Sequence, residues 1–328
     1  MRERILRELI ENRGSFISGQ EISRKYDITR ANVWKYIRKL KESGYEIESV
    51  TNKGYRLLEM PDSLDMIYLD FDKDWIIGRE YIYLDEVDST NEYAKKIASE
   101  KPDGAIVLAE NQYKGKGRLG REWTSLSQTG IWMSLILKPE ILPADAIIIT
   151  QVAAAAVVKG ITEILDCEVK IKWPNDIVLK NKKICGILTE FSGEIESINY
   201  IIVGIGINVN QKSKDFPEEI RDKAGSLREY AGKEISRKLI VKEIINYFNK
   251  YYFEFLKNQT FKGIIDICKK YSATLQNEVR IIQNGKEIIG KAVDLTDRGT
   301  LIIEDSKGVK SEIISGEVSV RGLYHYVD

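Results

Sequence analysis

The segment AIVLAENQYKGKGRLGREWTSLSQTGIWMSLIL, residues 105–137, decides which fold class the chain can have. Its two apolar ends predict β-strands, and a loop rich in glycine and arginine separates them. Gly115, Gly117 and Gly120 have the spacing G-x-G-x-x-G, which in dinucleotide-binding proteins opens a helix that receives a pyrophosphate. Here a second strand follows, so a dinucleotide-binding turn is excluded. A P-loop is excluded because no glycine-rich stretch ends in Gly-Lys-Ser or Gly-Lys-Thr.

The loop carries the cations Lys116, Arg118 and Arg121 between its glycines. Glycine lets backbone N–H groups come close to a ligand, and such a cationic, glycine-rich loop suits phosphate. Taken by itself, the loop is equally compatible with a solvated surface segment, and that alternative stays open at this point.

Composition narrows the chemistry. The chain has 328 residues, which predicts two or three domains, and 50 basic residues against 50 acidic ones, so contact with nucleic acid would need a local cluster of charge. The single histidine, His325, argues against histidine-based catalysis and multi-histidine metal sites. Chemistry would therefore depend on positive charge placed where negative charge develops.

Cysteine usage and hydropathy predict a cytoplasmic location. The three cysteines are far apart and form no C-x-x-C pair, which indicates a reducing compartment and no zinc site. The N-terminus is charged from Arg2 onward and lacks the apolar core of a signal peptide. The uncharged stretch 146–158 is too short to span a bilayer, so we expect no membrane association.

Residues 1–60 predict a winged helix-turn-helix. Thr29 is a good N-cap for a helix that places Val33, Ile37 and Leu40 on one face. The segment 46–57 alternates apolar and polar residues around a turn and predicts a two-stranded wing. A protein-contact module or a solvated basic face are the alternatives to DNA binding. The residues that we expect to contact DNA are Thr29, Arg30, Asn32, Trp34, Lys35, Arg38 and Lys39.

Five motifs follow one another over most of the remaining chain: STN at 89–91, GKGRLGREW at 115–123, KWPND at 172–176, KKICGIL at 182–188 and GIGINV at 204–209. In combination and order they resemble the biotin protein ligases, and the predicted winged helix resembles that of the bifunctional members, which also repress biotin genes. A non-catalytic biotin-sensing repressor is the alternative, and a lipoate ligase is a weaker one.

The resemblance implies an α+β multidomain architecture. We expect a winged helix-turn-helix at 1–60, a linker at 61–64, a class II synthetase-like catalytic domain with a mixed sheet at 65–270, and an SH3-like β-barrel at 271–328. Ser89 and Glu92 have the spacing of a capping box, which predicts a helix that continues through Ala98. Lys183 is expected to begin the second strand of a hairpin. By the sequence alone it could also be a surface lysine near a turn.

The resemblance also implies two half-reactions. Biotin and ATP, accompanied by Mg²⁺, give biotinyl-5′-adenylate, and the biotin then passes to a lysine of a biotin carboxyl carrier protein. The expected catalytic residues are Lys183, Arg118 and Asp176, of which Asp176 is also the expected magnesium contact. The expected biotin contacts are Ser89, Thr90, Asn91, Gln112, Gly115, Lys116, Gly117, Arg118 and Lys183. The expected ATP contacts are Lys116, Arg118, Arg121, Trp123, Lys172, Asn175, Asp176 and Asn208.

Further expectations concern assembly and regulation. In the bifunctional members of the family, ligand binding promotes a homodimer that binds a two-fold operator, and the resemblance implies the same here. One departure from the family pattern stands in the loop, where Lys116 replaces the usual arginine. Lysine keeps the positive charge but loses the planar fork that permits bidentate contact.

Overall fold

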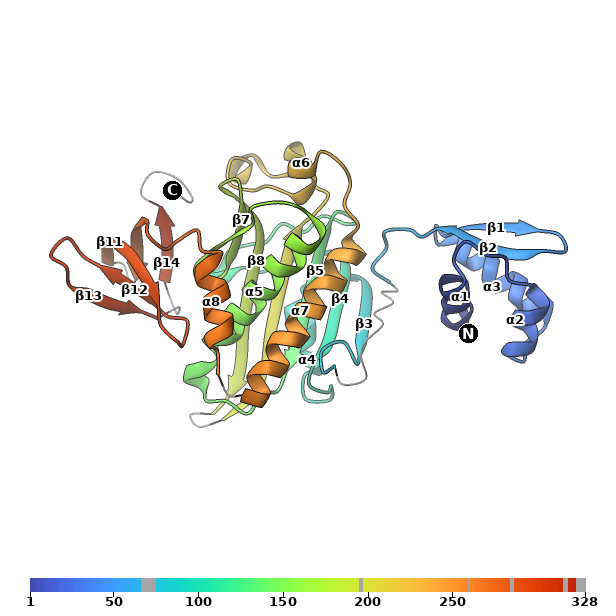
Figure 1. Ribbon diagram of the computed structural model, residues 1–328, viewed down its shortest axis with the longest axis horizontal. Helices are drawn as coiled ribbons and strands as arrows, with labels where there is room; N and C mark the ends of the chain where they lie inside the picture. Colours follow the sequence, from blue (N-terminus) through green and yellow to red (C-terminus); the bar gives the residue numbers. More distant parts are fainter. Residues whose placement is uncertain (66–74, 195–196, 259, 284–285, 315–317, 323–328) are drawn as a thin grey trace. The chain divides into compact units, whose positions relative to one another are not determined.

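The computed structural model describes residues 1–65, 75–194, 197–258, 260–283, 286–314 and 318–322. The chain divides into two compact units, Met1–Ser63 and Leu64–Asp328. Figure 1 labels most of the helices and strands of both units. The apolar core of the second unit includes Leu64, the first residue of that unit.

The first unit is a three-helix structure followed by a hairpin. Ser18 and Thr29 cap its second and third helices, because their hydroxyl oxygens accept hydrogen bonds from the backbone N–H groups of the first turns. Val33, Ile37 and Leu40 are buried on one face of the third helix, as the sequence predicts. The elements are α1 (Arg2–Glu11), α2 (Gly19–Lys25), α3 (Arg30–Glu42), β1 (Glu46–Val50) and β2 (Gly54–Glu59).

The hairpin of β1 and β2 is antiparallel, and its turn needs left-handed backbone. Asn52 has φ 67° and Gly54 has φ 107°. A Cβ at Gly54 would lie 2.0 Å from the carbonyl oxygen of Ile17, so glycine is required there. This is the wing expected from the sequence.

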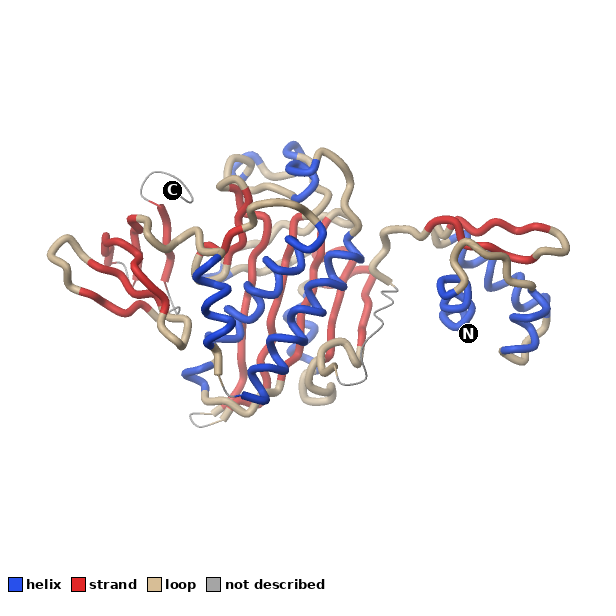
Figure 2. The backbone as a smooth tube through the Cα atoms, in the orientation of Figure 1, coloured by secondary structure: helices blue, strands red, loops and turns tan. Residues whose placement is uncertain are grey.

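The second unit is built on a seven-stranded mixed sheet of order β3-β4-β5-β9-β8-β7-β6. β3 and β4 are parallel and the other neighbours are antiparallel. Figure 2 shows the strands lying behind two long helices. The strands are β3 (Tyr81–Val87), β4 (Ala105–Gln112), β5 (Gly130–Leu137), β6 (Lys170–Lys172), β7 (Asp176–Leu179), β8 (Lys182–Gly193) and β9 (Ile198–Asn208).

Helices cover both faces of this sheet. α5 (Ile147–Ile164) and α7 (Arg237–Asn258) lie side by side on one face, and the short α4 (Thr90–Ile97) lies on the other (Figure 1). α4 contributes Ala94 to a separate small core with Val107 and Ile202. The polar N-terminal end of α4 thus reaches the sheet from the face opposite α5.

α5 is apolar enough and long enough to resemble a membrane span, with mean hydropathy 1.6 over 18 residues. In the structure 72% of that window is buried inside the protein. Its alanines and β-branched residues pack against α7 and the sheet, which identifies α5 as a core helix.

The C-terminal part contains α6 (Leu227–Ala231), α8 (Lys262–Lys270) and a five-stranded antiparallel sheet of order β13-β12-β11-β10-β14. The indole N–H of Trp173 donates a 2.9 Å hydrogen bond to the Gly299 carbonyl, which connects this part of the unit to the seven-stranded sheet and its helices. The sequence did not predict α8. The strands are β10 (Glu278–Gln283), β11 (Lys286–Leu295), β12 (Leu301–Glu304), β13 (Lys310–Ile313) and β14 (Val318–Gly322).

One local expectation is wrong. α4 begins after Ser89, as the capping box requires, but the Ser89 side chain makes no capping hydrogen bond. The Glu92 carboxylate does not reach back to the helix start, because Lys95 and Lys116 lie 2.9 Å and 3.0 Å from it and hold it. The Ser89 hydroxyl is consequently left for another role.

Candidate functional site

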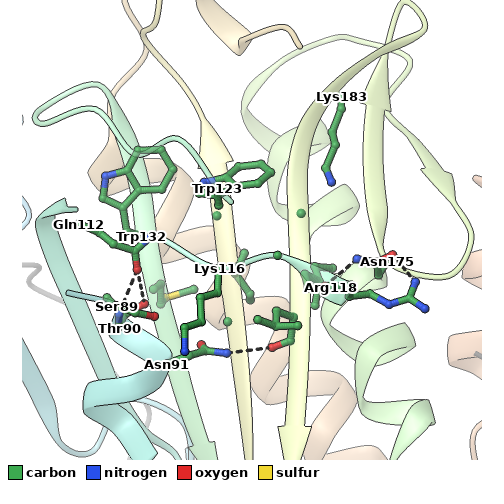
Figure 3. A pocket seen from close by; sticks show the side chains of 18 residues that line it. Ser89, Thr90, Asn91, Gln112, Lys116, Arg118, Trp123, Trp132, Asn175 and Lys183 are labelled. Atoms are coloured by element: carbon green, nitrogen blue, oxygen red, sulfur yellow. Dashed lines mark hydrogen bonds between the residues drawn. The ribbon is translucent and has the colours of Figure 1, made fainter. Parts of the chain in front are cut away.

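A cavity lies where β4, β5, β8 and β9 meet the start of α4 and the glycine-rich loop (Figure 3). Most of the residues that the sequence assigns to ligand binding line it, although they come from segments up to about a hundred positions apart. Those lining the cavity are Ser89, Thr90, Asn91, Gln112, Lys116, Gly117, Arg118, Trp123, Asn175 and Lys183.

The loop itself folds as a small hairpin. The Gly117 N–H donates to the Arg121 carbonyl at 2.7 Å, and the Trp123 N–H donates to the Gly115 carbonyl at 2.9 Å. A Cβ at Gly115 would lie 2.4 Å from the Trp123 carbonyl oxygen, so glycine is needed for this close crossing. The hairpin carries Lys116 and Arg118 to the cavity wall.

One side of the cavity is polar, and most of its side chains are joined by hydrogen bonds. The Ser134 hydroxyl lies 2.8 Å from Thr90 Oγ1 and 2.6 Å from Asn91 Oδ1. The Thr90 N–H donates to Gln112 Oε1 at 2.9 Å. Ser89 is 2% exposed, and its hydroxyl has no hydrogen-bond partner among the residues that the structure describes. A buried hydroxyl in that condition is a donor and acceptor offered to a ligand.

The walls between the two sides are apolar and flat. Trp132, Met133 and Ile187 line them, and Gly186 lies opposite Gly206 in the register of β8 and β9. The Trp123 indole packs over these two glycines. A Cβ at Gly206 would lie 2.7 Å from its Nε1, and one at Gly186 would lie 2.9 Å from its Cζ3.

Three cations border the cavity, and each has a fixed partner. Lys116 Nζ lies 3.0 Å from Glu92, Arg118 donates to Asn175 Oδ1 at 2.9 Å, and Lys183 Nζ lies 2.6 Å from Asp176. Figure 3 shows Arg118, Asn175 and Lys183 across the cavity from Ser89, Thr90 and Gln112. Burial lowers the pKa of the Arg118 guanidinium, against the opposing pull of Asp176.

Five of the predicted site residues stand outside the cavity wall as the described residues define it. Gly115 supports the loop crossing and Asp176 holds Lys183. Lys172 is 5% exposed in β6 and Asn208 is 4% exposed at the end of β9, while Arg121 is exposed on the loop. Their expected contacts with ATP stay predictions.

Sequence reasoning missed several residues of the site. Trp132, Met133 and Ser134 in β5 and Glu92 on α4 belong to no motif that points to a ligand. Trp132 and Ser134 are two positions apart in β5 and therefore point to the same face of the sheet. The parity of β5 could have found these two once the sheet order was known, whereas Met133 also packs in the large core and Glu92 joins the site through Lys116 of the loop.

Within the described residues, no group of three or more histidine, cysteine, aspartate or glutamate side chains could hold a metal ion. Asp176, the expected magnesium contact, faces the ammonium of Lys183. Asp176 is a single carboxylate at that end of the cavity, which fits a magnesium ion that arrives bound to the nucleotide phosphates.

A second candidate site lies on the first unit, in a groove bounded by α2, α3 and the wing. Trp34 is 55% exposed on α3, and the Arg38 guanidinium lies 5.2 Å from the centre of its ring. Lys35 and Lys39 are exposed and form no ion pair with another described residue. The wing contributes Lys53 to the same groove.

Three segments of the chain match models of known protein families. Residues 83–208 match the biotin/lipoate A/B protein ligase family, residues 2–56 match an HTH domain, and residues 274–321 match the biotin protein ligase C terminal domain. The three matches cover both units of the structure.

Two curated relatives extend over nearly the whole chain. The bifunctional ligase/repressor BirA of Bacillus spizizenii is 39% identical over 98% of this chain and 100% of its own length. The protein of the same name from Escherichia coli is 26% identical over 94% of each chain.

Among solved structures, the biotin protein ligase of Aquifex aeolicus in complex with biotin and ATP has a TM-score of 0.66 and 34% identity. The match covers 74% of this chain and 99% of that one. A second structure of the same enzyme without ligand gives a TM-score of 0.61 at 31% identity, with the same coverage.

Proposed function

The chain belongs to the family of bifunctional biotin ligases and repressors, and from this premise we propose that it activates biotin with ATP, transfers it to a carrier-protein lysine, and represses genes by binding operator DNA. The carrier is the biotin carboxyl carrier protein of a biotin-dependent carboxylase. The genes are those of biotin synthesis or uptake.

One observation carries the ligase proposal: the cavity has a polar side, apolar walls and cations across from the polar side. Biotin has the same three parts, a ureido head, an apolar bicyclic body and a carboxylate at the end of an aliphatic chain. The buried Ser89 hydroxyl is available for the head, and Trp132 and Met133 can cover the body. Lys183 and Arg118 are then available for the carboxylate.

The first half-reaction joins two anions. A biotin carboxylate oxygen attacks the α-phosphorus of ATP, the bond to the β-phosphate oxygen breaks, and pyrophosphate leaves. Repulsion between carboxylate and phosphate opposes the approach, so cations held in place lower the barrier. Arg118 and Lys183, with Lys116 from the loop, provide them without a histidine.

Fixed partners matter because a charge that is already oriented needs no reorganisation when the reaction occurs. The Asn175 side chain accepts from Arg118 and donates to the Ile187 carbonyl in β8 at 2.8 Å, so this strand holds the amide that orients the guanidinium. Asp176 orients Lys183 in the same way. Catalysis would come from this set, Lys183, Arg118 and Asp176.

For the nucleotide we propose contacts from Asn175, Asn208, Lys172 and Arg121, with Trp123 covering the ligand from the loop. Magnesium neutralises the phosphates as part of the ATP complex, and Asp176 is the acidic side chain beside it. Rearrangement of the glycine-rich hairpin over the adenylate would exclude water from the mixed anhydride.

In the second half-reaction the uncharged ε-amine of the acceptor lysine attacks the carbonyl carbon of the anhydride. An amide forms, AMP leaves with the electron pair of the broken C–O bond, and the amine loses a proton to solvent. Lys183 and Arg118 stabilise the negative charge that returns to the phosphate.

Regulation follows from the first unit. We propose that α3 enters the major groove, with base and phosphate contacts from Arg30, Asn32, Trp34, Lys35, Arg38 and Lys39 beside the N-cap Thr29. The loaded protein would form a homodimer that matches a two-fold operator. We also propose a linker at 61–64 and a boundary between the catalytic and C-terminal domains at residue 270. The C-terminal sheet would close into an SH3-like barrel, and the protein would be cytoplasmic.

Exchange of labelled pyrophosphate into ATP tests the ligase half. Purified protein with magnesium should exchange pyrophosphate only when biotin is present. Lipoate in place of biotin should not support the exchange. Biotin binding without any exchange would indicate a repressor that senses biotin without turning it over.

A further inference from the structure

Glu190 lies in β8, two positions beyond the cavity-lining Leu188, and belongs to no motif of the ligase. Its two carboxylate oxygens have different partners. Oε2 accepts a 2.9 Å hydrogen bond from Asn91 Nδ2, and Oε1 lies 2.7 Å from Lys95 Nζ. Asn91 lines the cavity and is 4% exposed. Glu190 therefore contacts Asn91, a cavity-lining side chain, without lining the cavity itself.

The direction of the Asn91 amide follows from its surroundings. An ionised carboxylate and a backbone carbonyl can accept hydrogen bonds but cannot donate them. Asn91 Nδ2 faces one of each, Glu190 Oε2 and the Leu188 carbonyl at 3.3 Å. Both amide hydrogens are thus used, and the amide oxygen must point the other way.

The oxygen of the Asn91 amide also has a hydrogen-bond partner of fixed direction. Ser134 Oγ lies 2.6 Å from Asn91 Oδ1 and carries one hydrogen, which it must donate to that oxygen. Ser134 Oγ also lies 2.8 Å from Thr90 Oγ1, whose hydroxyl lies 3.3 Å from the acceptor Gln112 Oε1. Donation runs one way from Ser134 to Asn91 and on to Glu190.

Asn91 Oδ1 can still accept a hydrogen bond from a ligand in the cavity. Its second lone pair remains after Ser134 has donated to the first. Gly204, a cavity-lining residue, lets the oxygen approach the strand, because a Cβ there would lie 2.3 Å from Oδ1. With both hydrogens bound by Glu190 and Leu188, Asn91 can offer a ligand only an acceptor.

We propose that Glu190 is a positioning residue that locks the Asn91 amide as an acceptor, and so makes this side of the cavity select a ligand that presents an N–H group. The inference rests on the proposed function, in which the ureido head of biotin supplies that N–H. Glu190 does not contact the ligand. It acts through Asn91.

Lys95 is the second partner of Glu190. Its ammonium lies between the Glu190 and Glu92 carboxylates, 2.9 Å from the latter, and its positive charge stabilises the negative charge of Glu190. The ion pair itself is about 30% exposed on both partners, so its direct contribution to stability is small. What a change at position 190 alters is the orientation of the neighbouring amide.

The test is biotin affinity by isothermal titration calorimetry on the full chain. Glu190→Gln has nearly the same shape, but its amide can donate as well as accept, so Asn91 can turn over. We expect biotin to bind about 10- to 100-fold more weakly, with ATP affinity within about 2-fold of wild type. The matched control, Glu163→Gln, removes a carboxylate that binds Tyr247 on the α5 side, and it should leave biotin affinity unchanged.

A double-mutant cycle shows whether Glu190 acts through Asn91. In an Asn91→Ala background, Glu190→Gln should weaken biotin by no more than about 2-fold further.

The possible results separate the two proposals. No biotin binding by the wild-type protein would refute the proposed function. Wild-type binding with unchanged affinity in Glu190→Gln would overturn the positioning role alone. So would an undiminished further loss of biotin affinity when Glu190→Gln is added to Asn91→Ala.

Discussion

The cavity of the second unit and the exposed face of α3 both collect positive charge, but they hold it differently. At the cavity, Lys116, Arg118 and Lys183 each lie within 3.0 Å of a fixed partner. On α3, Lys35 and Lys39 extend into solvent without an ion pair to any described residue. Held charges suit a small anion that must sit in one geometry, whereas mobile charges suit an extended polyanion.

The difference also separates two sources of specificity. At the cavity, selection comes from hydrogen bonds with a fixed direction, such as those around Asn91. On α3 it must come from the side chains that reach base edges, among which the exposed Trp34 is prominent. Salt should therefore weaken DNA binding steeply and biotin binding only slightly.

Removing a held cation should have the largest effect. Lys183→Ala is expected to weaken biotin by about 10- to 150-fold, since a hydrogen bond to a charged group contributes about 1.5 to 3 kcal/mol. Calorimetric titration with biotin measures this directly.

Lys182→Ala is the matched control for that variant. Lys182 precedes Lys183 in β8 and contacts the Arg221 carbonyl at 3.4 Å, away from the cavity wall. It should bind biotin within about 2-fold of wild type, because successive strand residues point to opposite faces. Equal losses in the two variants would show that the effect of Lys183→Ala does not depend on the position of Lys183 at the cavity.

Removing a mobile cation should have a smaller and different effect. Lys35→Ala is expected to lower the slope of log affinity against log salt by about 0.9 on a DNA duplex selected with the wild-type protein. Fluorescence anisotropy over a series of salt concentrations measures the slope. Lys250→Ala on α7 changes net charge equally and should leave the slope as it was. An unchanged slope in Lys35→Ala would mean that this lysine does not contact phosphate.

The smallest effect concerns stability of the first unit in acid. The hydrogen bond from Lys25 lowers the pKa of the Glu8 carboxyl below its ordinary value of 4.5, with a further contribution from Tyr26. A lowered carboxyl pKa contributes stability that is present above pH 4.5 and is lost as pH falls through the folded-state value.

Glu8→Gln should therefore be less stable than wild type at neutral pH and should lose less stability on acidification below about pH 4.5. Hydrogen exchange of peptides from residues 1–63 in the full chain measures this for the first unit. Parallel pH profiles for the two proteins would show that the Glu8 contact contributes nothing.

Much of the fold was predictable because it rests on local patterns. The two strands around the glycine-rich loop, the Thr29 cap and the turn of the wing depend on residues close in sequence. α8 was missed, although its apolar positions Ile264, Ile265 and Cys268 have helical spacing, since no cap or breaker drew attention to them.

The site was predictable only where a motif marked it. Ser89 and Lys183 come from recognisable stretches, but Glu190 in β8 lies 99 positions from Asn91 and meets it because α4 packs on the sheet. The capping box failed for a related reason, since Lys116 reaches Glu92 from a distant loop. Local spacing cannot anticipate a competing partner that tertiary structure supplies.

The most direct test of held cations as the catalytic device is formation of the adenylate itself. Wild-type protein and Arg118→Ala would be mixed with biotin, ATP and magnesium, quenched at intervals, and analysed by mass spectrometry. The wild type should accumulate about one biotinyl-5′-adenylate per chain, and the variant should form it about 100- to 1,000-fold more slowly. Absence of the adenylate in the wild type, or an equal rate in Arg118→Ala, would contradict the account.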